Sequence, residues 1–243
     1  MILSTTIKGL FFGSIGTLLG GLLGISVNNI SNKILSFILS FASGLMLSII
    51  CFDLLPEANK LSSITIILIG TILGVVTMFF CDSSINTRLL QKNETQNSLL
   101  RTGIAISIGL ALHNIPEGLA IGTGFSSSLK LGLSLAITIA IHDIPEGISM
   151  SIPLKACGLR KTKIIFYVLL SGIATGIGAL IGVVTVNISH YTIPVSIAFA
   201  AGAMLYIVSG ELTPEYSKLY SGKFPAIGNI LGFLLGYIAT QII

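Results

Sequence analysis

The sequence contains very little charge. Of its 243 residues only 9% are charged, none is tryptophan and 53% are hydrophobic, and the mean hydropathy is +0.97. A soluble domain carries roughly 25% charged residues, so this composition cannot supply a water-facing surface. The strands of an outer-membrane barrel alternate apolar and polar residues over about 10 positions, whereas the apolar runs here are continuous and longer. The composition therefore predicts an all-α integral membrane protein.

Paired cysteines and nucleotide-binding motifs are also missing. The three cysteines, Cys51, Cys81 and Cys157, show no CxxC spacing, and lone cysteines in apolar runs are usually small buried side chains. No GxxxxGK[ST] motif occurs, which excludes a P-loop ATPase as the energy source. The first apolar run is too long for the core of a secretory signal, so we expect a membrane span there.

Eight apolar runs have about the 20 residues that a helix needs to cross a bilayer. They are Ile7–Ile25, Ile34–Leu55, Ser62–Cys81, Thr102–Gly124, Leu131–Pro153, Ile164–Val186, Thr192–Leu212 and Phe224–Ile243. They predict a single transmembrane domain, residues 1–243, folded as a bundle of eight helices. The segment Asp82–Arg101 is polar and lacks strong periodicity, so we expect a mobile cytosolic loop.

The basic residues predict the orientation of the bundle. Ten of the 13 lysines and arginines fall in the loops after the first, third, fifth and seventh runs, and the other three, Lys8, Lys60 and Lys130, fall on the opposite side. The positive-inside rule places the richer side in the cytosol, so both termini are expected outside the cell. The basic charge is thus a topology signal and does not indicate a nucleic-acid partner.

Small residues recur at helix-packing spacing in the first and sixth runs. Such residues let helix backbones approach closely. We expect close packing at Gly16, Gly20, Gly24, Gly172, Gly176, Ala179 and Gly182.

Two polar hexads interrupt the fourth and fifth runs: "HNIPEG" at 113–118 and "HDIPEG" at 142–147. His113 and His142 each lie about 17 Å from the outer end of their helix, near the middle of the bilayer. Because the two helices are joined by a short turn, the hexads should meet at one depth. Ionisable groups at this depth cost at least about 2.5 kcal/mol each, so a duplicated pattern indicates a functional site.

The residue types in the hexads indicate a metal site between the fourth and fifth helices. Histidine and glutamate four residues apart share one helix face, and carboxylates this close repel one another unless a cation neutralises them. Imidazole and carboxylate suit zinc, iron or manganese. Pro116 and Pro145 leave backbone carbonyls without their helical donor, which is tolerated where they line a polar cavity. Gly118 and Gly147 leave room for close approach.

The paired hexads resemble the signature of the ZIP (Zrt/Irt-like) divalent-metal transporters, in particular the bacterial GufA-like and zinc-uptake branch, and the resemblance covers the whole chain. It implies a transport site for a divalent metal, zinc foremost and also iron, manganese or cadmium, and a homodimer in the cytoplasmic membrane. The site residues that it implies are His113, Asn114, Glu117, His142, Asp143, Glu146, Met46, Asp53 and Glu211.

The sequence also departs from the family pattern. Thr175 stands in "SGIAT" where the family often has a glutamate, which removes one carboxylate from a second metal position. We therefore expect one tightly bound ion per chain rather than two. The cytosolic loop contains no histidine run.

These features favour a metal importer that is not an enzyme, with the metal as substrate and no cofactor. Two alternatives stay open at this point. An intramembrane metalloprotease would need HExxH and an open coordination position, and here Asn114 or Asp143 follows each histidine. A metal-sensing receptor would need a signalling domain.

Overall fold

The long apolar runs fold into helices. The computed structural model describes residues 2–27, 30–90, 98–156, 158–186 and 191–242, and contains no strand among them. In chain order the elements are α1 (Ile2–Ser26), α2 (Asn32–Ser48), η1 (Ile49–Leu54), α3 (Leu55–Leu61), α4 (Ile64–Leu90), α5 (Ser98–Ser127), α6 (Leu129–Ala156), α7 (Lys161–Thr185), α8 (Thr192–Tyr206), η2 (Ile207–Leu212), α9 (Thr213–Leu219) and α10 (Phe224–Ile242).

Seven helical stretches within the described residues are long and apolar enough to cross a membrane. They are Ile2–Ser26, Asn32–Leu61, Ile64–Ser83, Leu129–Ile152, Lys161–Thr185, Thr192–Leu219 and Phe224–Gln241. The prediction of a helical, multi-pass membrane protein is therefore confirmed. Helix α5, with 30 residues, covers the position of the expected fourth span.

The expectation of a loop over Asp82–Arg101 is wrong at both ends. Helix α4 continues to Leu90 and α5 begins at Ser98, while residues 91–97 lie outside the described part of the chain. The physical reason is that 82–101 contains neither proline nor glycine, and its leucines, lysine and arginines are good helix formers. Polarity ended the expected span at the membrane surface, but polarity does not end a helix.

The second and seventh spans each contain a π-helical segment followed by a short α-helix. In η1 the N–H of Leu55 reaches the carbonyl of Ile50, and in η2 the N–H of Thr213 reaches that of Val208. Pro56 and Pro214 follow within the first turn of α3 and α9. Because proline cannot donate to the carbonyl four residues earlier, the α-helical ladder has to change there, and a π-helical turn absorbs the change.

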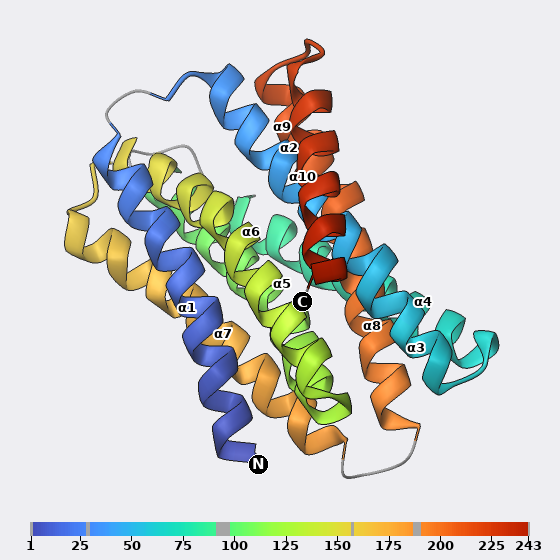
Figure 1. Cartoon of the computed structure of the whole chain (residues 1–243). Helices are drawn as coiled ribbons and strands as arrows, with labels where there is room; N and C mark the ends of the chain where they lie inside the picture. The colour runs from blue at the N-terminus through green and yellow to red at the C-terminus, as the bar shows by residue number, and fades with distance from the viewer. Residues whose placement is uncertain (1, 28–29, 91–97, 157, 187–190, 243) are drawn as a thin grey trace.

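The helices form two groups that lie side by side (Figure 1). One group contains α1, α5, α6 and α7, in which α1 packs on α6 and α7, and α5 packs on α7 and α6. In the other group α2 packs on α10 and α4 packs on α8. The groups meet where α5 contacts α8 and where α2 contacts α6.

The first and last thirds of the chain repeat each other at a constant spacing. The two π-helices begin 158 residues apart (207 minus 49), and at the same spacing "DLLPE" at 53–57 matches "ELTPE" at 211–215, and "GTILG" at 70–74 matches "GNILG" at 228–232. The helix packing follows the same repeat, in which α1 corresponds to α7, α2 to α8, α4 to α10 and α5 to α6. The packed pair α1–α6 thus corresponds to the packed pair α7–α5, and the pair α2–α10 corresponds to the pair α8–α4. The fold is thus built from two related units around a central helix pair.

Small residues hold the helices of the site together, as expected. A Cβ atom on Gly118 of α5 would collide with the carbonyl oxygen of Thr175 on α7, and one on Gly147 of α6 would collide with the carbonyl oxygen of Thr17 on α1. Gly16 and Gly20 of α1 face the backbone of α6 in the same way. The backbones touch here, so any larger residue must separate the helices.

Candidate metal site

Four of the predicted residues come together between α5 and α6. Glu117 extends from α5, and His142, Asp143 and Glu146 extend from α6. Each offers one ligand atom, and these atoms all lie within 4.8 Å of one another. All four residues are at most 1% exposed. The prediction that the two hexads meet at one depth is therefore correct for these residues, which we call the central cluster.

His142 lies among the three carboxylates of the central cluster. Its Nε2 atom is 3.0 Å from Glu117 Oε1, 3.4 Å from Asp143 Oδ1 and 3.9 Å from Glu146 Oε1. Only the first of these contacts has hydrogen-bond geometry. A single imidazole therefore faces three acidic groups, a set of nitrogen and oxygen donors that suits a borderline divalent metal.

Most carboxylate oxygens of the central cluster have no hydrogen-bond donor among the described residues. They are Glu117 Oε2 and both oxygens of Asp143 and of Glu146. Burying a polar group without a partner costs several kcal/mol, and burying an unpaired charge costs more. A divalent cation would supply the missing partner for several of these oxygens together. The cluster thus has the donors, the burial and the unmet charge of a cation site.

His113, the first hexad's histidine, contacts a different residue. Its Nε2 atom lies 2.7 Å from Oε2 of Glu211, which belongs to η2. His113 Nδ1 and Glu211 Oε1 have no partner among the described residues. The predicted site residues therefore divide between the central cluster and this neighbouring His113–Glu211 pair.

Asn114 contacts α7 through its side-chain amide nitrogen. Its amide nitrogen donates to the carbonyl oxygen and to the hydroxyl of Ser171, both at 3.1 Å. Its Oδ1 atom and the hydroxyl of Thr175 are buried without a partner in the described part of the chain. The counterpart of Thr175 in the repeat is Thr17, whose hydroxyl does have a partner: it donates to the carbonyl of Gly13 at 2.7 Å.

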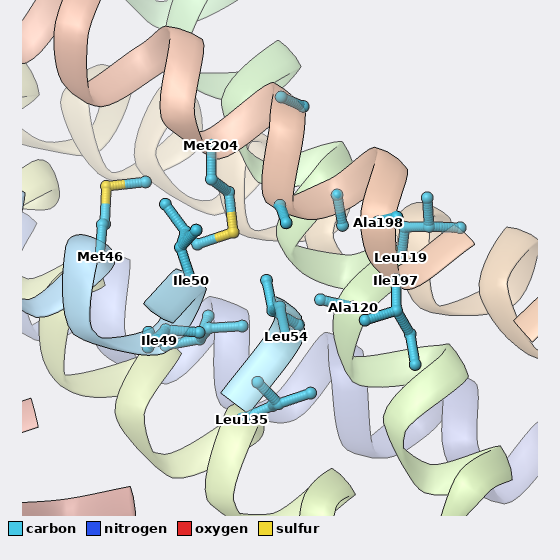
Figure 2. Close-up of a cluster of buried hydrophobic side chains, with 14 of the residues drawn as sticks. Met46, Ile49, Ile50, Leu54, Leu119, Ala120, Leu135, Ile197, Ala198 and Met204 are labelled. Atoms are coloured by element: carbon cyan, nitrogen blue, oxygen red, sulfur yellow. The ribbon is translucent and has the colours of Figure 1, made fainter. Parts of the chain in front are cut away.

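The remaining predicted residues lie on the second span. Asp53 is half-buried and accepts a hydrogen bond from Ser134 at 3.2 Å. Met46 is fully buried in an apolar cluster with Ile49, Ile50 and Leu54 (Figure 2), and its repeat counterpart Met204 lies in the same cluster. The metal-ligand role of Met46 stays a prediction.

The sequence of the chain matches those of a known group of proteins. The family model described as "ZIP Zinc transporter" matches residues 83–243. The chain is also 31% identical over 226 residues to the zinc transporter ZupT of Enterobacter sp. (strain 638), covering 89% of this chain and 88% of that protein. The chain belongs to the ZIP family. The resemblance inferred from the hexads is confirmed.

Other ZIP proteins match shorter parts. Zinc transporter GufA of Myxococcus xanthus is 38% identical over 132 residues, 54% of this chain and 52% of that protein. Zinc transporter ZIP11 of Xenopus tropicalis is 39% identical over 135 residues, 53% of this chain and 40% of that protein. The match therefore spans less than half the length of that ZIP11 relative.

The pairing of Glu211 with His113 was not predicted from the sequence. The signal that could have revealed it is the repeat of "DLLPE" as "ELTPE", because it places Asp53 and Glu211 at equivalent points of two related spans. Recognising that repeat would have identified Glu211 as the counterpart of Asp53, although the two residues make different contacts, since Asp53 accepts a hydrogen bond from Ser134.

Proposed function

We propose that this ZIP protein carries divalent metal cations, zinc foremost, across the cytoplasmic membrane into the cytosol. The observation that carries this proposal is the central cluster, in which His142 and three carboxylates are buried together and five carboxylate oxygens lack a donor among the described residues. Charged groups at such depth are costly, and a transported cation that satisfies them for part of each cycle accounts for their presence. Membership of a family of zinc transporters supports the same reading.

The proposed carrier is one transmembrane domain with eight spans: the seven apolar stretches described above and α5, which is the fourth in chain order. Both termini face outward, as the distribution of lysine and arginine predicts. The carrier works by moving one helix group relative to the other, as secondary transporters built from repeats do, and it assembles as a homodimer. A cysteine introduced at Asn93 should be modified by impermeant reagents only from the cytosolic side, and labelling from outside intact cells would refute this topology.

Zinc uptake into proteoliposomes tests the proposed function. The wild-type protein should accumulate zinc, and Glu117→Gln and Glu146→Gln should reduce uptake to background because each removes a charged ligand but keeps the side-chain shape. Asp82→Asn is the matched control: this carboxylate accepts a hydrogen bond from Tyr206 at 3.0 Å and lies outside the central cluster. Wild-type uptake by either glutamate variant would refute the role of the central cluster.

The same preparation separates the alternatives. Cleavage of membrane peptides without zinc flux would indicate a protease. Metal binding with neither flux nor cleavage would indicate a receptor.

A further inference from the structure

An apolar groove lies between α2 and α6. Its volume is about 350 Å³, and its walls include Phe37 and Phe41 of α2 and Ile141, Ile144 and Pro145 of α6. All of these side chains except that of Pro145 are half-buried, so the groove opens onto the outside of the helix bundle. Its volume lies within the range of about 300 to 1,000 Å³ that small-molecule sites occupy. An apolar ligand can therefore enter it from the surroundings of the protein.

The groove lies at the depth of lipid acyl chains. The membrane-spanning stretch that contains α2 begins at Asn32, and Phe37 and Phe41 follow five and nine residues later. With a rise of about 1.5 Å per residue, these two positions are about 8 and 14 Å into the span. One leaflet supplies about 15 Å of the hydrocarbon core of a bilayer. The surroundings onto which the groove opens are therefore the tails of the lipids in one leaflet.

Two exposed lysines lie at the end of the groove where α2 begins. Lys33 precedes Phe37 by four residues, which is one helical turn on the same face. Its Nζ atom lies 4.7 Å from the ring centroid of Phe224 on α10, which packs beside α2 (Figure 1), and that ring lies 4.8 Å from the ring of Phe37. Lys223 directly precedes Phe224 in the chain and is also exposed. Neither lysine pairs with a carboxylate among the described residues, so two positive charges are available to a ligand in the groove.

We propose that this groove binds one acyl chain of an anionic phospholipid, whose phosphate pairs with Lys33 and Lys223. The apolar walls and the depth of the groove select the tail. The two lysines select the charge, and they lie on the side of the membrane that carries ten of the 13 lysines and arginines. One lysine near a membrane surface favours an anionic lipid about fivefold. A phospholipid supplies the tail and the phosphate together, and its site is separate from the central cluster.

The bound tail supports the part of α6 that carries the central cluster. Ile141, Ile144 and Pro145 of the groove alternate along the chain with the cluster residues His142, Asp143 and Glu146. Because Pro145 has no N–H group, it cannot donate to the carbonyl of Ile141, and the helix loses a hydrogen bond at this turn. An acyl chain packed against Ile141 and Pro145 stabilises the turn from the side opposite the metal ligands.

Fluorescence quenching by brominated lipids tests the site, because the chain contains no tryptophan and a single introduced one reports only the lipid beside it. Phe41→Trp places the reporter in the groove, and Ile177→Trp is the control on α7, where the side chain is 49% exposed. In phosphatidylcholine bilayers, brominated phosphatidylglycerol should quench the groove reporter half-maximally at a mole fraction at least fivefold lower than the control reporter. Equal mole fractions, or no quenching in the groove, would overturn the proposal. An equal preference of the groove reporter for brominated phosphatidylcholine would refute the role of the charge.

Charge variants of the groove reporter test the headgroup contact. Lys33→Gln with Lys223→Gln should abolish the preference for phosphatidylglycerol, and the corresponding pair of arginine substitutions should keep it. Lys161→Gln with Lys163→Gln is the matched control, because it removes two exposed lysines from the start of α7, on the same side of the membrane. A preference that survives the first pair of substitutions, or that the control pair abolishes equally, would overturn the proposal.

Thermal unfolding of the metal-free protein in detergent tests the support of α6. A ligand that binds only the folded state raises the melting temperature. Added phosphatidylglycerol should therefore raise the melting temperature of the wild type more than phosphatidylcholine does, and the difference should vanish in Lys33→Gln with Lys223→Gln. Equal effects of the two lipids on the wild type would contradict the proposal.

Discussion

Replacing Asp143 by asparagine should make the metal-free protein more stable and the metal-bound protein less so. Both oxygens of Asp143 are buried without a hydrogen-bond donor among the described residues, and the side chain lies within the 4.8 Å cluster that contains two further carboxylates. Two negative charges at 4.8 Å repel by about 3.5 kcal/mol at an effective dielectric constant of about 20. Because a carboxyl group can relieve part of this repulsion by binding a proton, we expect Asp143→Asn to raise the free energy of unfolding by about 1 to 3 kcal/mol.

The same substitution removes one negative ligand and should weaken zinc binding at least tenfold, or about 1.4 kcal/mol. Asparagine fits this position because Asn114 occupies the equivalent point of the first hexad. Thermal unfolding in detergent with a chelator measures the first effect, and isothermal titration calorimetry measures the second. Asp82→Asn is the control: this carboxylate accepts a hydrogen bond from Tyr206, so its variant should gain no stability and should bind zinc normally. A metal-free Asp143→Asn protein that is less stable than wild type, or that binds zinc as tightly, would refute the reasoning.

Three further substitutions test other parts of the site. Thr175→Glu should raise the zinc stoichiometry measured by calorimetry from one ion per chain to two. The substitution adds a carboxylate where a buried hydroxyl now lacks a partner among the described residues. Two equally tight ions in the wild type would contradict this. Asn114→Asp should tighten zinc binding about tenfold, because it adds a fourth carboxylate to the two hexads. Unchanged affinity in calorimetry would contradict this. Gly147→Ala should reduce the folded yield and lower the melting temperature, because the added Cβ would collide with the carbonyl oxygen of Thr17. Gly210→Ala is the control and should be tolerated, because a Cβ there would lie 3.4 Å from the nearest atom, on the ring of Tyr206. Equal yields of the two variants would contradict the packing argument.

The sequence was sufficient to predict contacts between neighbouring helices. Continuous apolar runs fix the class of protein, and the shared depth of the two hexads is enough to bring Glu117 to His142. Contacts between distant helices were not predictable in the same way. The pairing of His113 with Glu211 joins residues that are far apart in the chain. It depends on the relative position of the two helix groups along their axes. Hydropathy contains no information about that register.

The ends of the helices were also beyond a hydropathy argument. Proline was expected to disturb backbone hydrogen bonding in the hexads. At two other prolines, Pro56 and Pro214, π-helical turns accommodate the disturbance, and the helices continue to Leu61 and Leu219. A π-helical turn rotates every later side chain around the helix axis. The direction of Asp53 and Glu211 thus depends on a local geometry that no periodicity of 3.6 residues can reveal.

The two halves of the repeat share a scaffold but differ in their ligands. In this chain the scaffold is nearly symmetrical, since Gly118 and Gly147 make equivalent contacts with Thr175 and Thr17. The ligands are not symmetrical, because an aspartate stands in one hexad where the other has Asn114. The difference in ligand charge between two otherwise identical hexads therefore lies at a single position, and substitutions at Asn114 and Asp143 test its effect on metal binding directly.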